Sequence, residues 1–589
     1  MGRLLKRITI GILVVLALTL SAIYLTGFRA SRLVNELLHD WATGEVATQS
    51  DSIYALQIGK LHFNWPLRRI TLDSALVVTD SARNARRSWP IATVRGVLRT
   101  CVISGVDLPK LVLGRGLQAS QIGCAQVQWL SDAPADSAAV TRWQARMARP
   151  RAPAPRPKPA PGARPSTTAA PHGAVMTFQQ NLNLPSRVPT IRVGRITFPS
   201  VAVGIVQHQP SGDRTRFDLA RARLRVTGIV IDDAEPQYRT RPLFAEGVVL
   251  QADSTEFRPD TAQITRVGSL EVNLTDSTLT VRDFENGPRV SDAEFQRRSP
   301  YRRDRIRVTA ARLSIRGMDQ GAYSRSGAIV ARAIELDSFR FDIRSDKRKP
   351  KRPGPSSPSR TPQGWMASFE NRLAVDTIHA TNAAIIYEEF KTGHDQPGRL
   401  TIDNVDLTVL NVRHEPGRIS GTDTLSLEIR GRLMQQGQLR VAISTLLDAP
   451  RMTMYVRGAV GAMDAQAFNP LIEHVAPARI KSGRVDGVTF EYTVTNDRAL
   501  GVVIPRYRGL AAEITGTGAH GILGARNPIG GLLRATAEAA QGLKVRQNNP
   551  GSPTEQPRVG RIDYTFRGES LPSWFWNVIK QGLLSVALK

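Results

Sequence analysis

The stretch Lys481–Leu500, KSGRVDGVTFEYTVTNDRAL, alternates nonpolar and polar residues with a period of two. This period predicts a β-strand that has its nonpolar side chains on one face, namely Val488, Phe490, Tyr492 and Val494. The dipeptide Asn496-Asp497 supplies turn residues, and a second alternating run follows at Leu500, Val502 and Ile504. The two runs together predict a β-hairpin.

A short pattern, a glycine followed by an alternating strand, recurs along the chain. It occurs at Gly59, Gly194, Gly268, Gly483 and Gly560. We expect each glycine to form a turn or bulge, as a curved sheet requires. The spacing is irregular, which favours a long meandering sheet over a propeller or a strict solenoid. The predicted fold is therefore mainly β: an elongated, twisted, groove-like antiparallel sheet with a few helices.

Residues 8–28 contain no charged side chain. At about 1.5 Å per residue they are long enough to cross the bilayer's hydrocarbon core of about 30 Å. The alternative is a cleaved signal peptide, but no A-x-A-like cleavage site follows. Basic residues crowd the preceding tail, residues 1–7, which places that tail in the cytoplasm. We expect a single-pass anchor with the bulk of the chain outside the cytoplasm.

The chain has 589 residues and a formal net charge of +28. Much of the excess lies in two Pro-rich segments, 145–172 and 344–363, which we expect to be solvated linkers. Contact of these segments with anionic lipid headgroups or with another envelope polyanion is the alternative. Nucleic acid is excluded as a partner if the anchor has the expected topology, because these segments then lie outside the cytoplasm.

The linkers divide the chain into β-rich regions at 29–144 and 173–343, a groove region at 364–525 and a C-terminal part at 526–589. Helices are expected at Ser31–Ala42, Gly530–Gln541 and Ser570–Lys589. The last of these is amphipathic, and its aromatic residues suit a membrane interface: Trp574, Phe575 and Trp576. A helix that plugs the end of the sheet is an equally good interpretation.

Residues that could carry chemistry are scattered. Cys101 and Cys124 form either a disulfide that braces a hairpin or two reduced core thiols. Glu388 and Glu389 are neighbours on a predicted strand, so they point to opposite faces and cannot act as an acid and base pair. Residues 516–521 match G-x-G-x-x-G, but too little chain follows for a paired dinucleotide fold. We expect no enzyme activity, no catalytic residues, no metal and no cofactor.

The residues around the opening stretch resemble a known family. Val460–Ile472 contains a strand followed by an Asp…Asn-Pro-Leu segment, and Ile480–Val485 is similar to an I-x-S-G strand opening. Over Arg451–Ile514 the chain therefore resembles the AsmA-like family of bacterial envelope proteins, which is related to TamB-type and bridge-like lipid transfer proteins. The closing strand at Gly560–Tyr564 and the helix at Trp574–Leu584 also resemble the end of that family.

The resemblance implies a periplasmic protein, anchored in the bacterial inner membrane, that shields phospholipid or other acyl chains and supports outer-membrane lipid homeostasis. Its groove would be lined by Val488, Phe490, Tyr492, Val494, Val502 and Ile504. The alternative is an envelope scaffold or outer-membrane protein assembly factor, whose sheet edge pairs with client strands. Other partners would then be outer-membrane or envelope proteins.

Overall fold

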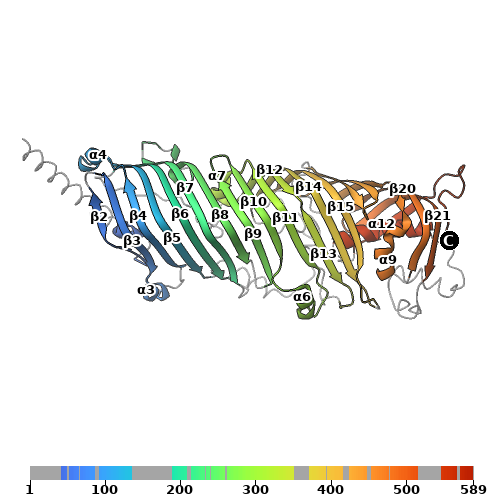
Figure 1. The fold of residues 1–589 in the computed structure, drawn as a ribbon. Coiled ribbons are helices and arrows are strands. Elements are labelled where there is room, and N and C mark those ends of the chain that lie inside the picture. Colours follow the sequence, from blue (N-terminus) through green and yellow to red (C-terminus); the bar gives the residue numbers. More distant parts are fainter. Residues whose placement is uncertain are drawn as a thin grey trace, which may run out of the picture. The chain divides into compact units, whose positions relative to one another are not determined.

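Strands dominate the computed structural model, as the alternating sequence predicts (Figure 1). The structure describes residues 42–49, 52–64, 67–86, 92–134, 189–208, 214–232, 234–235, 237–238, 241–258, 262–350, 371–392, 394–415, 424–447, 453–475, 478–514, 545–566 and 571–587. The expected anchor at 8–28, the helix at 530–541, the linker at 145–172 and the glycine-rich 516–521 lie outside these residues, as does the helix expected at 31–42 except for its last residue. Within them, no helix is both long and apolar enough to cross a membrane.

The chain forms two compact units, and the boundary falls within strand β9 (Gln263–Asn273). The first unit holds β1 (Tyr54–Ile58), β2 (Leu61–Asn64), β3 (Arg69–Thr79), β4 (Thr93–Ser104), β5 (Leu117–Ala133), β6 (Thr190–His208), β7 (Arg214–Asp232) and β8 (Ala245–Arg258). Its short helices are α2 (Ala42–Gln49), α3 (Ser81–Ala85), α4 (Leu108–Val112) and η3 (Pro242–Phe244). Both β1 and β2 pair with β3, and from β3 to β8 each strand pairs with the next one in the chain.

The second unit continues with β10 (Thr278–Pro288), β11 (Arg305–Arg316), β12 (Ile329–Asp337), β13 (Arg340–Asp346), β14 (Leu373–Phe390), β15 (Gly398–His414), β16 (Thr424–Leu433) and β17 (Gly437–Leu446). It ends with β18 (Thr453–Val460), β19 (Met463–Asp464), β20 (Ala478–Thr495), β21 (Arg498–Ile514) and β22 (Gly560–Thr565). Its helices are α6 (Asp292–Arg298), α7 (Gln320–Ser326), η5 (Ala465–Phe468), α9 (Asn469–Val475) and α12 (Leu571–Ala587). The expected C-terminal helix is thus confirmed, and the expected hairpin is β20 and β21 with a turn at residues 496–497.

The expectation of a purely antiparallel arrangement is wrong. β5 and β6 pair in parallel, and so does β14 with both β12 and β13. Parallel neighbours need a crossover connection of about a dozen residues or more. The two Pro-rich segments supply this length, because one lies between β5 and β6 and the other between β13 and β14. The second segment begins later than expected, since β13 extends to Asp346.

Several strands contain a non-glycine residue with positive φ. Examples are Asn382 in β14, with φ of 52°, and Asn404 in β15, with φ of 50°, and the pairing register shifts at both. Such bulges bend a strand and add one residue to it. In β14, both Ala380 and Ala383 stay buried on either side of the extra residue. The bulge therefore turns the strand while keeping its nonpolar side chains on one face.

Gly483 has the role expected for the glycines of the recurrent pattern, whereas Gly59 and Gly194 have a different one. Only Gly483 combines positive φ, 136°, with a register shift. A Cβ at Gly59 would lie 2.6 Å from the Ser74 Oγ, and one at Gly194 would lie 2.7 Å from the Ser120 carbonyl oxygen. These two glycines are therefore required by the close approach of a neighbouring strand rather than by their own backbone conformation.

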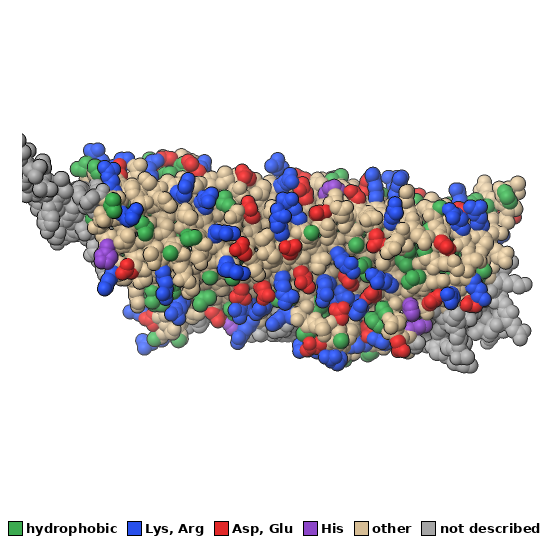
Figure 2. All heavy atoms as spheres, viewed as in Figure 1, with side chains coloured by type: hydrophobic (Ala, Val, Ile, Leu, Met, Phe, Trp, Pro, Cys, Tyr) green, Lys and Arg blue, Asp and Glu red, His purple; other side chains and the backbone are tan. Residues whose placement is uncertain are grey.

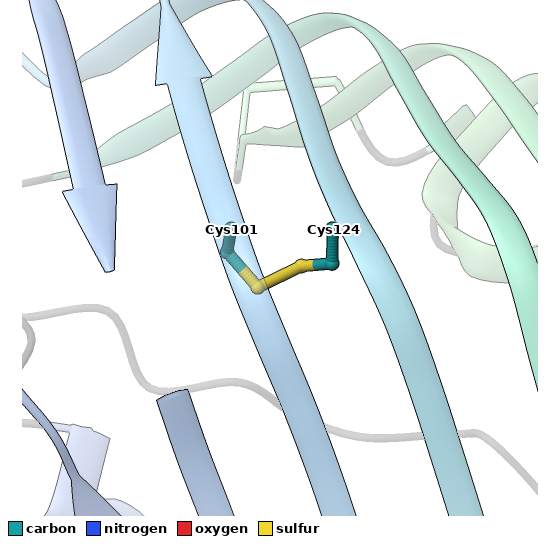
Figure 3. Close-up of a disulfide and its surroundings, with 2 residues drawn as sticks. All are labelled: Cys101 and Cys124. Atoms are coloured by element: carbon teal, nitrogen blue, oxygen red, sulfur yellow. A yellow bond between two sulfur atoms is a disulfide. The ribbon is translucent and has the colours of Figure 1, made fainter. Parts of the chain in front are cut away.

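A disulfide joins Cys101 of β4 to Cys124 of β5 (Figure 3). The two residues are direct register partners, with their Cα atoms 3.9 Å apart, and both are buried. Of the two alternatives left open by the sequence, the structure therefore has the disulfide, and it ties two neighbouring strands of the first unit.

Candidate functional site

One face of the strands in the second unit carries two unbroken rows of nonpolar and aromatic residues. Register partners on neighbouring strands point to the same side of a sheet. Every strand from β10 to β22 except β13 and β19 contributes one residue to each row. The first row is Val281, Leu313, Leu336, Ala380, Leu407, Ile429, Val441, Gly458, Phe490, Val503 and Gly560. The second row is Leu279, Ile315, Ile334, Ile378, Val409, Leu427, Ile443, Val456, Tyr492, Gly501 and Ile562. We call the side that carries these rows the nonpolar face.

The first unit has a nonpolar face of the same kind. One row runs from β2 to β8 and consists of Phe63, Ile70, Ile103, Ile122, Ile196, Val226 and Val248. The disulfide lies two residues along β4 and β5 from this row, so Cys101 and Cys124 belong to the same face. Alternation within one strand places its polar and nonpolar residues on opposite faces. Here the nonpolar positions of many successive strands are also register partners, so they all lie on the same face.

Helix α12 covers the C-terminal end of the nonpolar face in the second unit (Figure 1). Its buried residues recur every four positions, at Trp574, Val578, Gly582 and Val586, and form one stripe along the helix. Trp574 and Val578 pack in one cluster with Phe490, Tyr492, Val494 and Val503 from β20 and β21. The sheet and helix thus close this end with the chain's own side chains.

Further from α12, the nonpolar face is packed less completely. Val375 and Val409 are buried in a cluster whose described members come from strands and one adjoining turn, and none from a helix. Several row residues in and beside this cluster are only partly buried, including Ile334, Ile378 and Leu427. The same holds for Ile122 and Ile196 in the first unit. Helix α12 thus packs on the C-terminal end of the rows, whereas the described members of the cluster around Val375 and Val409 include no helical residue.

The residues expected to line a groove do not share one face. Val488, Phe490, Tyr492 and Val494 lie on the nonpolar face under α12. Val502 and Ile504 lie on the opposite face, because the two-residue turn pairs Thr495 with Arg498 and so pairs Phe490 with Val503. This corrects the expectation for Val502 and Ile504. Val502 is 39% exposed, whereas Val503 is fully buried.

The opposite face of the second unit is polar and contains a hollow of about 450 Å³. Val502 and Ile504 contribute to its lining together with charged residues of both signs, which include Glu428, Arg430, Arg440, Arg457 and Glu491. Figure 2 shows one face of the molecule, on which basic and acidic side chains are likewise interspersed. The two faces of the sheet thus differ strongly in polarity.

The aromatic residues expected at a membrane interface are instead part of the core or beside it. Trp574 is fully buried, with its ring 6.2 Å from that of Phe566 and 5.1 Å from that of Phe575. Phe575 packs against the same cluster, and Trp576 is half-buried. The structure therefore agrees with the other interpretation, in which this helix plugs the end of the sheet.

Polar groups under α12 are incompletely hydrogen-bonded. The Tyr492 hydroxyl and the Trp574 Nε1 are buried and have no hydrogen-bond partner among the described residues. Burial raises the pKa of Tyr492 above its ordinary value, because it disfavours the charged phenolate. Unpaired buried polar groups are costly, so this end of the nonpolar face is not an ideally satisfied core.

The adjacent carboxylates point to opposite faces, as predicted. Glu388 accepts a hydrogen bond of 2.8 Å from the Arg344 Nε, whereas Glu389 pairs with Lys347. Among the described residues, no group of three or more His, Cys, Asp or Glu side chains is placed to hold a metal ion. The feature of the described chain that calls for a functional explanation is therefore its nonpolar face.

No protein-family model matches this chain, and none of the curated proteins matches it.

Proposed function

We propose that the protein binds acyl chains of lipids along its nonpolar face and carries them without chemical change, as a membrane-anchored lipid-transfer protein of the bacterial envelope. The observation that supports this most directly is the pair of unbroken nonpolar rows from β10 to β22. Polar side chains would interrupt such rows if the face were merely a solvated surface. The opposite face of the sheet is polar, so that face can remain in contact with water.

The length of the rows suits acyl chains. Outside the cluster under α12, each row continues over β10–β12 and β14–β16, and five spacings of about 4.8 Å between neighbouring strands extend over roughly 24 Å. A bilayer's hydrocarbon core is about 30 Å thick and holds two acyl chains end to end, so one chain measures about 15 Å. A row is therefore longer than one acyl chain, and a lipid can move along it without entering water.

The energetics favour an occupant. Nonpolar area removed from water contributes about 25 cal/mol per Å². Row residues such as Ile378 and Leu427 are only partly buried by the described chain, so an acyl chain lying across them gains the remaining burial. Valine, leucine and isoleucine recognise the shape and apolarity of such a chain without any reactive group.

The proposed location is the periplasm, with the anchor at residues 8–28 in the inner membrane. The disulfide supports this, because disulfides persist in oxidising compartments. The resemblance of Arg451–Ile514 to AsmA-like proteins agrees with the same location and belongs to the proposal.

The test is mass spectrometry of lipids that co-purify with the whole chain in detergent. Wild-type protein should retain phospholipid, and Leu427→Glu, on the nonpolar face, should retain several-fold less. Arg430→Glu is the matched control on the same strand, because its side chain is 71% exposed on the opposite face. A wild type that carries no lipid, or equal retention by both variants, contradicts the proposal.

A further inference from the structure

Three arginines surround the hollow of about 450 Å³ on the polar face of the second unit. Arg430 of β16 and Arg440 of β17 are direct register partners. Arg457 of β18 lies diagonally across from Arg440, because Arg440 pairs with Ala459, two residues further along β18. Like charges opposite each other on neighbouring strands destabilise a sheet. The placement of these arginines is therefore not explained by the stability of the sheet.

Two of these arginines have no acidic partner in the described part of the chain. Arg440 and Arg457 both line the hollow, and neither forms an ion pair with a described residue. Glu491 is the register partner of Arg457, but its Oε1 instead accepts a hydrogen bond of 2.5 Å from the Tyr455 hydroxyl. The two guanidinium groups are therefore available to an external carboxylate.

The other acids near the hollow do not change this. Glu428 lies 3.7 Å from Arg430, and both side chains are more than half exposed, so this ion pair contributes little. Asp406 is the register partner of Arg430 outside the hollow, and its carboxylate lies 3.4 Å from the His379 Nε2. The hollow itself is lined by three arginines and two glutamates and so has a net positive charge.

Nonpolar side chains adjoin the arginines on the same face. Ala442 has a small side chain and lines the hollow, and Val502 lines it on the side of β21. Tyr455 and Leu500 are both register partners of Thr493, so they lie on this face as well. The side chains of Tyr455, Leu500 and Val502 are all more than a third exposed. Exposed nonpolar residues that lie together, rather than singly, are typical of an interaction surface.

We propose that this surface binds an extended polypeptide segment in which acidic residues adjoin nonpolar ones. We call the surface the arginine patch, and it consists of Arg430, Arg440, Arg457, Tyr455, Leu500 and Val502. The inference goes beyond the proposed function, because the patch lies on the face opposite to the nonpolar rows. Arginine binds carboxylates through two parallel hydrogen bonds, and arginine and tyrosine are enriched where proteins bind each other. Four strand spacings of about 4.8 Å, from β16 to β21, measure about 19 Å, which an extended segment of about six residues crosses.

Charge complementarity favours this occupant over two others. A uniformly anionic polymer would be repelled by Glu428 and Glu491, which line the same hollow. The chain itself offers no strongly acidic long segment outside the described residues. More basic than acidic residues occur in each of the longer ones, 1–41, 135–188, 351–370 and 515–544. An acidic segment of a separate partner therefore fits the patch best.

The test measures the binding of labelled peptides of about eight residues to the whole chain in detergent, by fluorescence anisotropy. The probe is Gly-Asp-Asp-Ser-Leu-Val-Leu-Gly. One control peptide has lysine in place of aspartate, and the other has serine in place of leucine and valine. Wild-type protein should bind the probe about tenfold more tightly than either control peptide, the equivalent of one charge-assisted hydrogen bond.

Variants of the patch test the assignment. The double variant Arg440→Gln/Arg457→Gln should bind the probe about tenfold more weakly, whereas Arg432→Gln should bind it as the wild type does. Arg432 is the matched control, because it is exposed on the same face of β16 and does not line the hollow. Thermal unfolding shows whether each variant is folded. Ala442→Trp, which fills the hollow, is the second variant if the double variant is not.

The outcomes separate the arginine patch from the proposed function. Failure of the wild type to bind the probe, or equal affinity for the three peptides, overturns the patch. Unchanged affinity in the folded variants of the patch also overturns it. If the acidic peptide without nonpolar residues binds as tightly as the probe, the surface binds polyanions instead. Lipid retention is measured separately, so a protein that retains lipid and does not bind the probe contradicts only the patch.

Discussion

Gly560 of β22 lies so close to Gly582 of α12 that a Cβ on Gly560 would be 2.1 Å from the Gly582 carbonyl oxygen. A Cβ on Gly582 would in turn be 2.4 Å from the Val503 Cγ1. Neither contact is possible for real atoms, so only glycine at both positions lets the helix backbone approach the sheet. This approach is what buries Trp574 and closes the end of the nonpolar face.

Replacing Gly560 by alanine should push α12 away from the sheet. Because the clash is with a backbone atom, no side-chain rotation relieves it, and we expect the free energy of unfolding to fall by about 1–3 kcal/mol. Chemical denaturation measures this. Gly461→Ala is the control, since its Cβ would approach its nearest neighbour only to 3.4 Å. Equal stability of the two variants would show that α12 is not seated on Gly560.

Replacing Tyr492 by phenylalanine should leave stability unchanged or raise it by about 1 kcal/mol. The substitution removes a buried hydroxyl that has no partner among the described residues and keeps the ring. Thermal unfolding checks this against Tyr455→Phe, which removes a hydroxyl that donates to the Glu491 Oε1 on the exposed face. A loss of stability in Tyr492→Phe would mean that the hydroxyl is hydrogen-bonded.

Removing the disulfide should destabilise the first unit by about 3 kcal/mol, given a sequence separation of 23 between the two cysteines. Calorimetry of the double variant Cys101→Ala/Cys124→Ala should show the unfolding transition of the first unit at lower temperature and that of the second unit unmoved. A shift of both transitions to the same extent would contradict the division into two compact units.

Stability should rise with pH between about 8 and 10.5. The pKa of Lys580 is about 8 in the folded protein, against an ordinary value of 10.5, so in this window the unfolded chain binds a proton that the folded chain does not. Below pH 8 both states are protonated, and the full cost of burying the charge is present. Lys580→Met should make the protein more stable at pH 7 and reduce the slope. The pKa of Lys391 is also lowered, so the variant should keep part of the slope. Identical pH profiles for wild type and variant would contradict this.

The sequence predicts the hairpin of β20 and β21 well, because alternation and a two-residue turn are local signals. The sequence assigns Val502 and Ile504 to the wrong face because both faces of β21 carry nonpolar residues. The larger nonpolar residues of this strand lie on the polar face of the sheet. The length of the turn specifies the correct face. A two-residue turn pairs Thr495 with Arg498, and this register places Ala499, Gly501 and Val503 opposite Val494, Tyr492 and Phe490. Register, rather than side-chain size, decides the face.

Other features depend on contacts between distant parts of the chain. The parallel pairing of β14 with β12 and β13 follows from a long connection whose return point no local pattern specifies. The bulges at Asn382 and Asn404 place non-glycine residues at positive φ, whereas the recurrent sequence pattern predicts bulges at glycines. The charges that act on Lys580 of α12 belong to Glu389, Lys347 and Lys391, which come from distant segments of the sequence.

Photo-crosslinking tests the central claim most directly. A photoreactive amino acid is placed at Ile429, on the nonpolar face, or at Arg430, its neighbour on the opposite face. The account predicts that living cells yield lipid adducts at position 429 and few or none at position 430. Polypeptide adducts at 429 would instead favour a scaffold that binds client strands, and equal lipid labelling at both positions would contradict a lipid-carrying face.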